Sequence, residues 1–335
     1  MRYRRTATRR LPTPAGTPAA HVRALATGLD FAYRDRVARI ATLDRTALDA
    51  ARAVLAAACT HDRAAEVAAE KLFGDGPNGA AAHAFAAHDD AGRLVGAAAV
   101  SGRYLRVLAI APDARGRGAG SALLAACEDH ARAAGESRLR ALDQPGNYLA
   151  PGIDDANLDT LAWLARRGWQ RGADTRENIL VAVRDNPRVT PARAATAAAA
   201  ASSQGYEIRR ARADERALVD AAAAEFGGAW PFELSRALAH AEPGVHVAVK
   251  DGAYCAFAAH DGNNQGLGWF GPTGTWPAHR GRGLGEALLL ACLVDVARDH
   301  ARCEVAWIGP RPFYDKVAGV VADRRFAVMT KELRT

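Results

Sequence analysis

The sequence has no apolar run of about 18 residues, the length that a membrane-spanning helix needs, although 49% of its 335 residues are hydrophobic. No membrane partner is therefore expected. There is no C-x-x-C pair, and the five cysteines are an odd number. Disulfides and zinc sites are not expected, and free thiols favour a reducing, cytoplasmic compartment. No His, Cys or Asp cluster has metal-ligand spacing, so no metal is expected.

Two further absences narrow the chemistry. No Gly-x-Ser-x-Gly occurs, and no glycine-rich turn ends in Gly-Lys-Ser/Thr, which argues against a serine hydrolase and a nucleotide P-loop. The net charge is +7, but residues 1–20 hold five arginines and no acid. The rest of the chain is nearly balanced, so no nucleic-acid partner is expected. Residues 1–20 are predicted to be a disordered basic tail.

One pattern occurs twice. An apolar segment ending at Ala111 is followed by Pro112, a turn with three glycines over 115–120, and a helix pattern. The same order returns with Pro277 and a turn over 280–285. Both turns read R-x-x-G-x-G. Two matching turns in one context, strand, turn and helix, indicate an internal duplication.

Such a turn suits anion binding. The first amides of a helix have no partner within the helix and carry partial positive charge. Glycines remove the Cβ atoms that would keep a ligand from this backbone. The result is a seat for a phosphate or pyrophosphate. The alternative is that the glycines serve only the geometry of the turn.

The motif P-x-x-R-G-x-G-x-G, followed by a helix with A-L-L, resembles the acyl-CoA-binding segment of the GNAT superfamily of N-acetyltransferases. The resemblance implies an α+β fold of two tandem GNAT domains. Each would have a mixed, mostly antiparallel sheet with helices on both faces, and one sheet often continues into the other. We place the first domain at 21–186, a linker at 187–204 and the second domain at 205–335.

The resemblance also implies acetyl-CoA as co-substrate, held by turn amides and by the strand before each turn. The predicted coenzyme-binding residues of the second half are Thr273, Thr275, Arg280, Gly281, Arg282, Gly283, Leu284, Gly285 and Glu286. Those of the first half are Leu108, Ile110, Arg115, Gly116, Arg117, Gly118, Ala119, Gly120 and Ser121.

The two halves differ where the family places a tyrosine that donates a proton to the leaving thiolate. In the second half this position is Tyr314, for which a packing role is the alternative, and in the first half it is Leu164. Leucine cannot donate a proton, so the first half needs another donor, such as Tyr148, or is not catalytic. Glu225 and Glu233 flank the predicted acceptor pocket of the second half and are the candidate general bases, with His246, His260 and His279 as alternatives.

Two segments between the motifs complete the pattern. Residues 169–183 are predicted to form a hairpin that closes the first domain. The alanine-rich stretch 187–204 is predicted to be a linker or weak helical spacer outside the core.

The leading hypothesis is an acetyl-CoA-dependent N-acetyltransferase. It would acetylate a primary amine of a small molecule by direct attack in a ternary complex, as a monomer or homodimer. The alternatives are acetylation of a protein or peptide amine, and a non-catalytic acyl-CoA sensor.

Overall fold

The computed structural model describes residues 38–333, which belong to one compact unit; the predicted tail at 1–20 lies outside them. The first half contains β1 (Arg39–Thr42), α1 (Leu48–Ala58), α2 (Ala68–Phe73), β2 (His83–His88), β3 (Leu94–Ser101), β4 (Tyr104–Ile110), α3 (Ala119–Ala133), β5 (Arg138–Ala141), β6 (Ile153–Asp154), α4 (Leu158–Ala165) and β7 (Gln170–Ala182).

The second half repeats this order after one additional helix. It contains α5 (Pro191–Ser202), β8 (Glu207–Arg210), α6 (Arg216–Glu225), α7 (Trp230–Leu238), β9 (Val245–Lys250), β10 (Ala253–His260), β11 (Trp269–Thr275), α8 (Leu284–Val296), β12 (Arg302–Val305), α9 (Arg311–Val317) and β13 (Ala322–Glu332).

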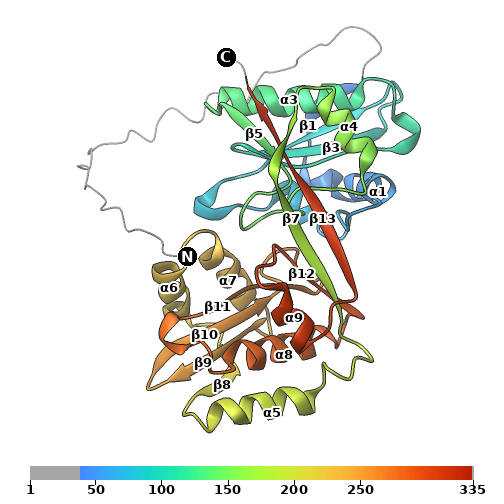
Figure 1. Cartoon of the computed structure of the whole chain (residues 1–335). Helices are drawn as coiled ribbons and strands as arrows, with labels where there is room; N and C mark the ends of the chain where they lie inside the picture. The colour runs from blue at the N-terminus through green and yellow to red at the C-terminus, as the bar shows by residue number, and fades with distance from the viewer. Residues whose placement is uncertain (1–37, 334–335) are drawn as a thin grey trace, which may run out of the picture. The chain divides into compact units, whose positions relative to one another are not determined.

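All the main strands of the described residues belong to one sheet, in the order β1-β2-β3-β4-β5-β13-β7-β12-β11-β10-β9-β8. The last strand, β13, pairs with β5 of the first half, and β7 of the first half pairs with β12 of the second. The two long strands lie side by side where the halves meet (Figure 1). The expected α+β fold and the continuation of one sheet into the other are thus confirmed.

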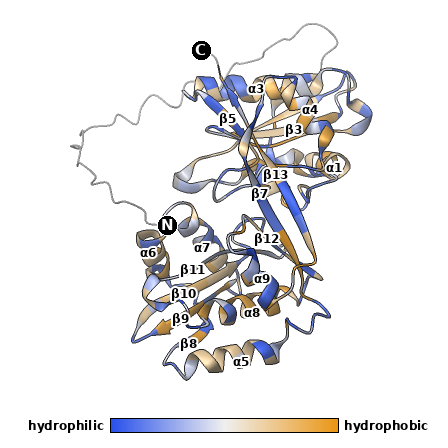
Figure 2. Ribbon diagram, viewed as in Figure 1, coloured by the Kyte–Doolittle hydropathy of each residue, from blue (hydrophilic) through white to orange (hydrophobic). Residues whose placement is uncertain are grey.

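The hairpin predicted over 169–183 is wrong. These residues form one continuous strand, β7, whose antiparallel partner is β13 from the end of the chain. Residues 170–175, which include Gly172 and Asp174, are exposed strand and form no turn. Figure 2 shows hydrophilic residues along β7 and β13. A partner 150 residues away leaves no signal near the strand itself, and that is why the segment resembled a hairpin.

The placement of residues 187–204 outside the core is also wrong. Thr190 caps α5 by accepting a hydrogen bond from the amide of Arg193 at 3.2 Å. Val189 and Ala201 are buried in the same core cluster as Leu288 of α8. Alanines allow α5 to lie close to α8, and α8 is covered by the sheet on its other side. This explains why α8 is apolar almost all round, as its colour in Figure 2 shows.

Candidate active site

Each glycine turn forms an open seat at the start of a helix. Gly118 precedes α3 with φ 86°, and Gly283 precedes α8 with φ 80°. Gly116 and Gly281 have φ 77° and 76°. A Cβ added at Gly116, Gly281 or Gly283 would meet nothing within 4 Å. Left-handed backbone and free space on the ligand side fit a diphosphate held by helix amides.

The first arginine of each turn donates a hydrogen bond to the strand that precedes the turn. The Nε of Arg115 donates to the carbonyl of Ile110 at 3.2 Å, and the Nε of Arg280 donates to that of Thr275 at 3.1 Å. These two side chains therefore shape the turns. Arg117 and Arg282 are exposed beside the glycines, where their charge favours an anion.

The other predicted coenzyme-binding residues lie around the helix starts. Ala119 and Leu284 are buried, and a Cβ on Gly120 or Gly285 would approach Trp163 or Phe313. Ser121 accepts a hydrogen bond from Arg167 at 2.7 Å. Glu286 pairs with Arg193 of α5 at 3.4 Å. The side chains of Ser121 and Glu286 are therefore engaged within the protein.

In both halves the strand before the turn separates from its parallel neighbour. The β4–β5 pairing consists of Tyr104 with Arg140 and Leu105 with Ala141. The β11–β12 pairing consists of Trp269 with Glu304 and Phe270 with Val305. Beyond these pairs, β4 continues to its end at Ile110 and β11 to its end at Thr275, with no parallel partner among the described residues. Each half thus has a gap between two strands that are paired only at one end.

The halves differ at the position just beyond the last strand pair. In the first half it is Arg106, which is fully buried and donates to the side chain of Gln144 and to the carbonyl of Gly74. Burial lowers the pKa of Arg106 to about 10. In the second half it is Gly271, and a Cβ there would meet nothing within 4 Å. The first gap is therefore filled where the second is open.

The positions compared from sequence are structurally equivalent. Trp163 lies against Gly120 as Phe313 lies against Gly285, at 3.3 and 3.5 Å from an added Cβ. The next residues, Leu164 and Tyr314, are both buried. Tyr314 packs edge-on against Phe270 of β11, with ring centroids 6.3 Å apart. Burial raises the pKa of Tyr314 to about 12, so its hydroxyl keeps its proton at neutral pH.

The two candidate bases lie in different surroundings. Glu225 is exposed at the end of α6. Glu233 on α7 is buried, and burial raises the pKa of its carboxyl to about 7 against the opposing charges of Lys71 and Arg236. A carboxyl that titrates near neutrality is suited to proton transfer.

Sequence reasoning missed that the first half contributes to the second half's site. Tyr148, a possible proton donor for the first gap, instead faces the second. Its hydroxyl accepts a hydrogen bond from Trp269 Nε1 at 3.3 Å, and its ring packs edge-on against Trp307. Only the position of Tyr148 after β5 was visible in the sequence, and strand exchange then brings this loop to β11.

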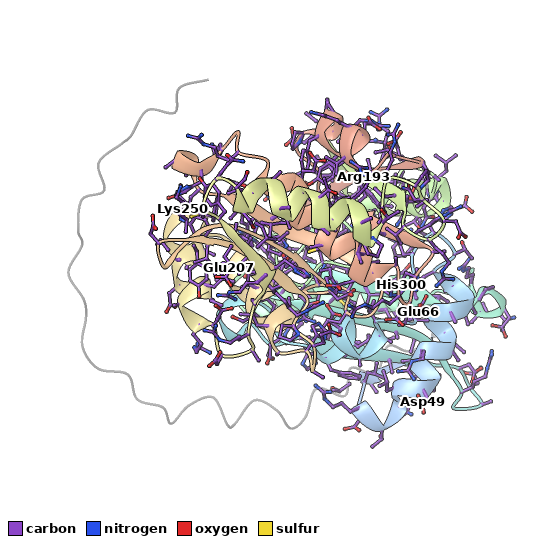
Figure 3. The ribbon with its side chains drawn as sticks, turned by 90° about the horizontal axis from the view of Figure 1, so that it is seen from below. Asp49, Glu66, Arg193, Glu207, Lys250 and His300 are labelled. Carbon is purple, nitrogen blue, oxygen red and sulfur yellow. The ribbon has the colours of Figure 1, made fainter. Side chains whose placement is uncertain are left out.

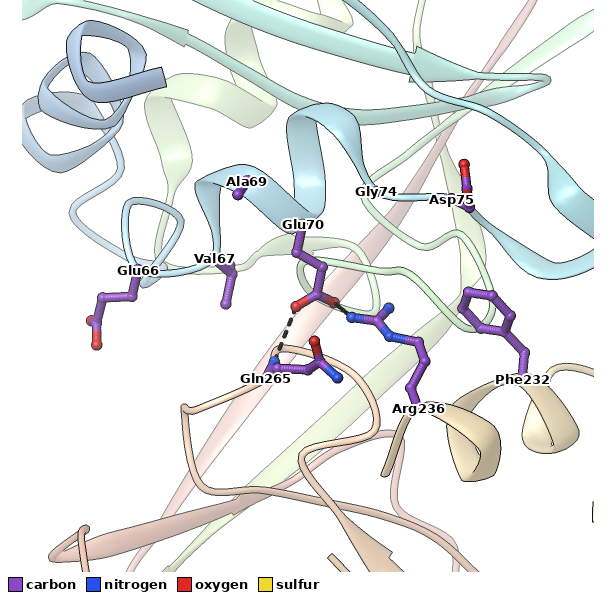
Figure 4. Close-up of a pocket in the computed structure, with 9 residues that line it drawn as sticks. All are labelled: Glu66, Val67, Ala69, Glu70, Gly74, Asp75, Phe232, Arg236 and Gln265. Atoms are coloured by element: carbon purple, nitrogen blue, oxygen red, sulfur yellow. Dashed lines mark hydrogen bonds and ion pairs between the residues drawn. The ribbon is translucent and has the colours of Figure 1, made fainter. Parts of the chain in front are cut away.

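A buried polar cluster joins the two halves beside Glu233. Lys71 is fully buried and donates to Glu70, Asn147 and Asn263 at 2.7, 2.9 and 2.9 Å. Glu70 also pairs with Arg236 of α7 at 3.0 Å and accepts from the amide of Gln265 (Figure 4). Of these groups, Glu70, Arg236 and Gln265 line a cavity of about 470 Å³.

Glu66, which also lines this cavity, lies at the surface close to His300 (Figure 3), and the two side chains interact electrostatically. Burial would raise the pKa of Glu70, but Lys71 and Arg236 outweigh it and hold that pKa at about 2.

Two glycine turns, each at a helix start and beside a pair of strands that separate, mark a tandem fold built from one repeated α+β unit. The chain matches the model of the acetyltransferase (GNAT) family over residues 48–150 and again over 215–319. It therefore belongs to that family and is an acyl-CoA-dependent N-acetyltransferase, with acetyl-CoA as the family's co-substrate.

Solved structures share the whole tandem fold. A glucosamine N-acetyltransferase region of a fungal multi-domain β-N-acetylglucosaminidase aligns with a TM-score of 0.69, 16% identity, 89% of this chain and 38% of that one. This chain thus spans well under half of that protein. A tandem GNAT protein of the clavulanic acid biosynthesis pathway aligns with a TM-score of 0.63 and 22% identity, over 88% of this chain and 98% of that one. A GCN5-related N-acetyltransferase from Sphaerobacter thermophilus aligns with a TM-score of 0.57 and 20% identity, over 90% of this chain and 97% of that one. A comparison with curated proteins finds no match.

Within residues 38–333 no helix is long and apolar enough to cross a bilayer, and no three His, Cys, Asp or Glu side chains are grouped to hold a metal. All five cysteines are free thiols.

Proposed function

We propose that the second half of the chain transfers an acetyl group from acetyl-CoA to a primary amine of a small molecule, by direct attack within a ternary complex. The observation that carries this proposal is that Tyr314 has a protonated hydroxyl beside the open gap of the second half, where the first half has Leu164. Acetyl-CoA supplies the thioester from which the acetyl group is transferred.

The site residues of the second half would have separate roles in this reaction. The glycine turn over 280–285 would hold the diphosphate, and the strand residues Thr273 and Thr275 the extended arm. A backbone amide there would donate to the carbonyl oxygen of the thioester. Glu233 would take the proton of the amine, directly or through water. Tyr314 would donate a hydrogen bond to the sulfur.

A small acceptor is favoured over a peptide because the end of the gap is covered. The loop that carries Tyr148 lies over Trp269, and Tyr148, Trp269 and Glu233 are all buried. A peptide would need an open groove. The buried carboxyl of Glu233 also lies beside this loop, and a negative charge there favours binding of an amine. The free thiols support a cytoplasmic setting.

The first half is proposed to bind coenzyme without catalysis. Its glycine turn is open, but Arg106 fills the gap beyond and Leu164 replaces the tyrosine. The role of a non-catalytic acyl-CoA sensor is therefore proposed for the first half alone.

The proposal is tested by thiol release from acetyl-CoA with a panel of small amines and lysine peptides. We expect release with at least one small amine and no release with the peptides. Saturable coenzyme binding with no release from any acceptor would instead favour the sensor.

A further inference from the structure

A second cavity, of about 260 Å³, lies at the closed end of the gap between β4 and β5. Tyr104 and Arg140, which pair across these strands, form part of its wall. Trp307 of the second half forms another part. The remaining lining is strongly basic and consists of Arg103, Arg138, Asp143, Pro145 and Arg176.

Two of its four arginines are neutralised by acids. Arg140 pairs with the buried Asp143, and Arg138 pairs with Glu332 at 2.5 Å. Glu136 and Asp174 act only at longer range, on Arg103 and Arg140.

The other two arginines, Arg103 and Arg176, form no ion pair with any residue of 38–333. Each lies over an aromatic ring of the lining instead, Arg103 at 5.5 Å from the Tyr104 centroid and Arg176 at 4.6 Å from that of Trp307. Asp143, which already pairs with Arg140, also acts on Arg176 from within the lining, and the four arginines still give the cavity an excess of positive charge.

Arg103 Nε donates to the hydroxyl of Tyr104 at 3.4 Å. Contact with the two rings holds both guanidinium groups in the lining, where their other N–H groups can donate to a ligand. A fixed guanidinium matches a phosphate or carboxylate through parallel hydrogen bonds. The cavity is slightly smaller than the usual range for drug-sized ligands, about 300 to 1,000 Å³. Its ligand is accordingly small.

We propose that this cavity binds a small phosphate monoester, with its phosphate held between Arg103 and Arg176. Because Trp307 follows β12 while the arginines belong to the first half, the ligand would touch both halves at once. The inference does not require either half to transfer acetyl groups, and its readout is binding alone.

The test is calorimetry on the full chain with inorganic phosphate at constant ionic strength, in saturating coenzyme A so that the glycine turns are occupied. We expect one further saturable site in the wild type. Loss of one charged hydrogen bond should weaken it about tenfold or more in Arg103→Gln and in Arg176→Gln. Arg325→Gln on β13, an exposed arginine outside the cavity, is the matched control and should bind as the wild type does.

Absence of saturable binding, wild-type affinity in both cavity variants, or equal weakening in Arg325→Gln would each overturn the proposal. Arg103 is exposed on the β3–β4 hairpin, so its variant should fold even if Arg176→Gln does not. Glucose 6-phosphate and succinate are titrated in the same way, and their affinities are compared. Tighter binding of the phosphate ester supports the assignment, and tenfold tighter binding of succinate would replace phosphate by a dicarboxylate.

Discussion

Lys71 of α2 donates a hydrogen bond at 2.9 Å to the side chain of Asn263, which lies in the loop that precedes β11. With Glu70 and Asn147 as further acceptors, all three protons of the ammonium are satisfied without water. Burial lowers the pKa of Lys71 to about 8, while Glu70 opposes the shift. One buried cation thus connects the loop after β5 with the second half.

The first prediction is that Lys71→Met strongly destabilises the protein. Removal of the ammonium leaves the side-chain oxygens of Asn147 and Asn263 without this donor and takes one of several donors from Glu70, at a cost of about 3 kcal/mol or more. Chemical denaturation measures the loss. Lys316→Met on α9, an exposed site, should change stability by less than about 0.5 kcal/mol. Equal effects of the two changes would contradict the role of Lys71.

The second prediction concerns His260. Burial works to lower its pKa, but hydrogen bonds and charge from Asp261 and Asp295 outweigh it and raise that pKa to about 9. Below the unfolded value near pH 6.5 the stabilisation is complete, and it is lost as pH rises through about 9. Over this window the wild type should lose about 2 to 3 kcal/mol relative to His260→Gln. Denaturation of both proteins at pH 6 and 9 measures this difference, and parallel pH dependences would contradict it.

The sequence predicted most of the fold because the signals for it are local. Strand, glycine turn and helix follow one another around Gly118 and again around Gly283, and the Asp251-Gly252 turn marks the β9–β10 hairpin. It failed for β7 because the partner of that strand is β13, at the end of the chain. Periodicity describes the faces of an element and does not identify a distant neighbour.

The same limit applies to the candidate site. Tyr314 and Leu164 could be compared because they follow the same helix pattern, and the structure places both at equivalent positions. Neither Arg106, buried in one gap, nor Tyr148, directed into the other, could be predicted. Their positions depend on which loops strand exchange brings together.

The third prediction concerns the coenzyme seat of the second half. Valine at Gly283 would force a β-branched residue to φ 80° and place carbon atoms over the helix amides. Loss of about two charged hydrogen bonds should weaken acetyl-CoA binding about a hundredfold. Gly252→Val is the matched control, since Gly252 has φ 77° and open space at a hairpin turn. Calorimetry should show the loss in Gly283→Val only.

The fourth prediction assigns a pH limb to Glu233. With a pKa near 7, its carboxyl is protonated in acid and becomes a base as pH rises. Turnover should therefore increase through pH 7 in the wild type. Glu233→Gln should lower turnover and abolish this limb, whereas Glu225→Gln, at an exposed site, should retain it. A wild-type pH profile in Glu233→Gln would transfer the role of base to another group.

The last prediction separates chemistry from packing at Tyr314. Tyr314→Phe keeps the ring contacts with Phe270 and Phe313 and removes only the hydroxyl. Since a thiol has a pKa of about 8.5, the tyrosine, at about 12, acts as a hydrogen-bond donor that retains its proton for most of the reaction. Turnover should fall about a hundredfold, with coenzyme affinity unchanged. The control is Tyr254→Phe, which should keep full turnover. The hydroxyl of Tyr254 donates a hydrogen bond to Glu215 at 3.1 Å and has no role in the proposed reaction. If Tyr314→Phe also kept full turnover, Tyr314 would be a packing residue and the second half would need another donor.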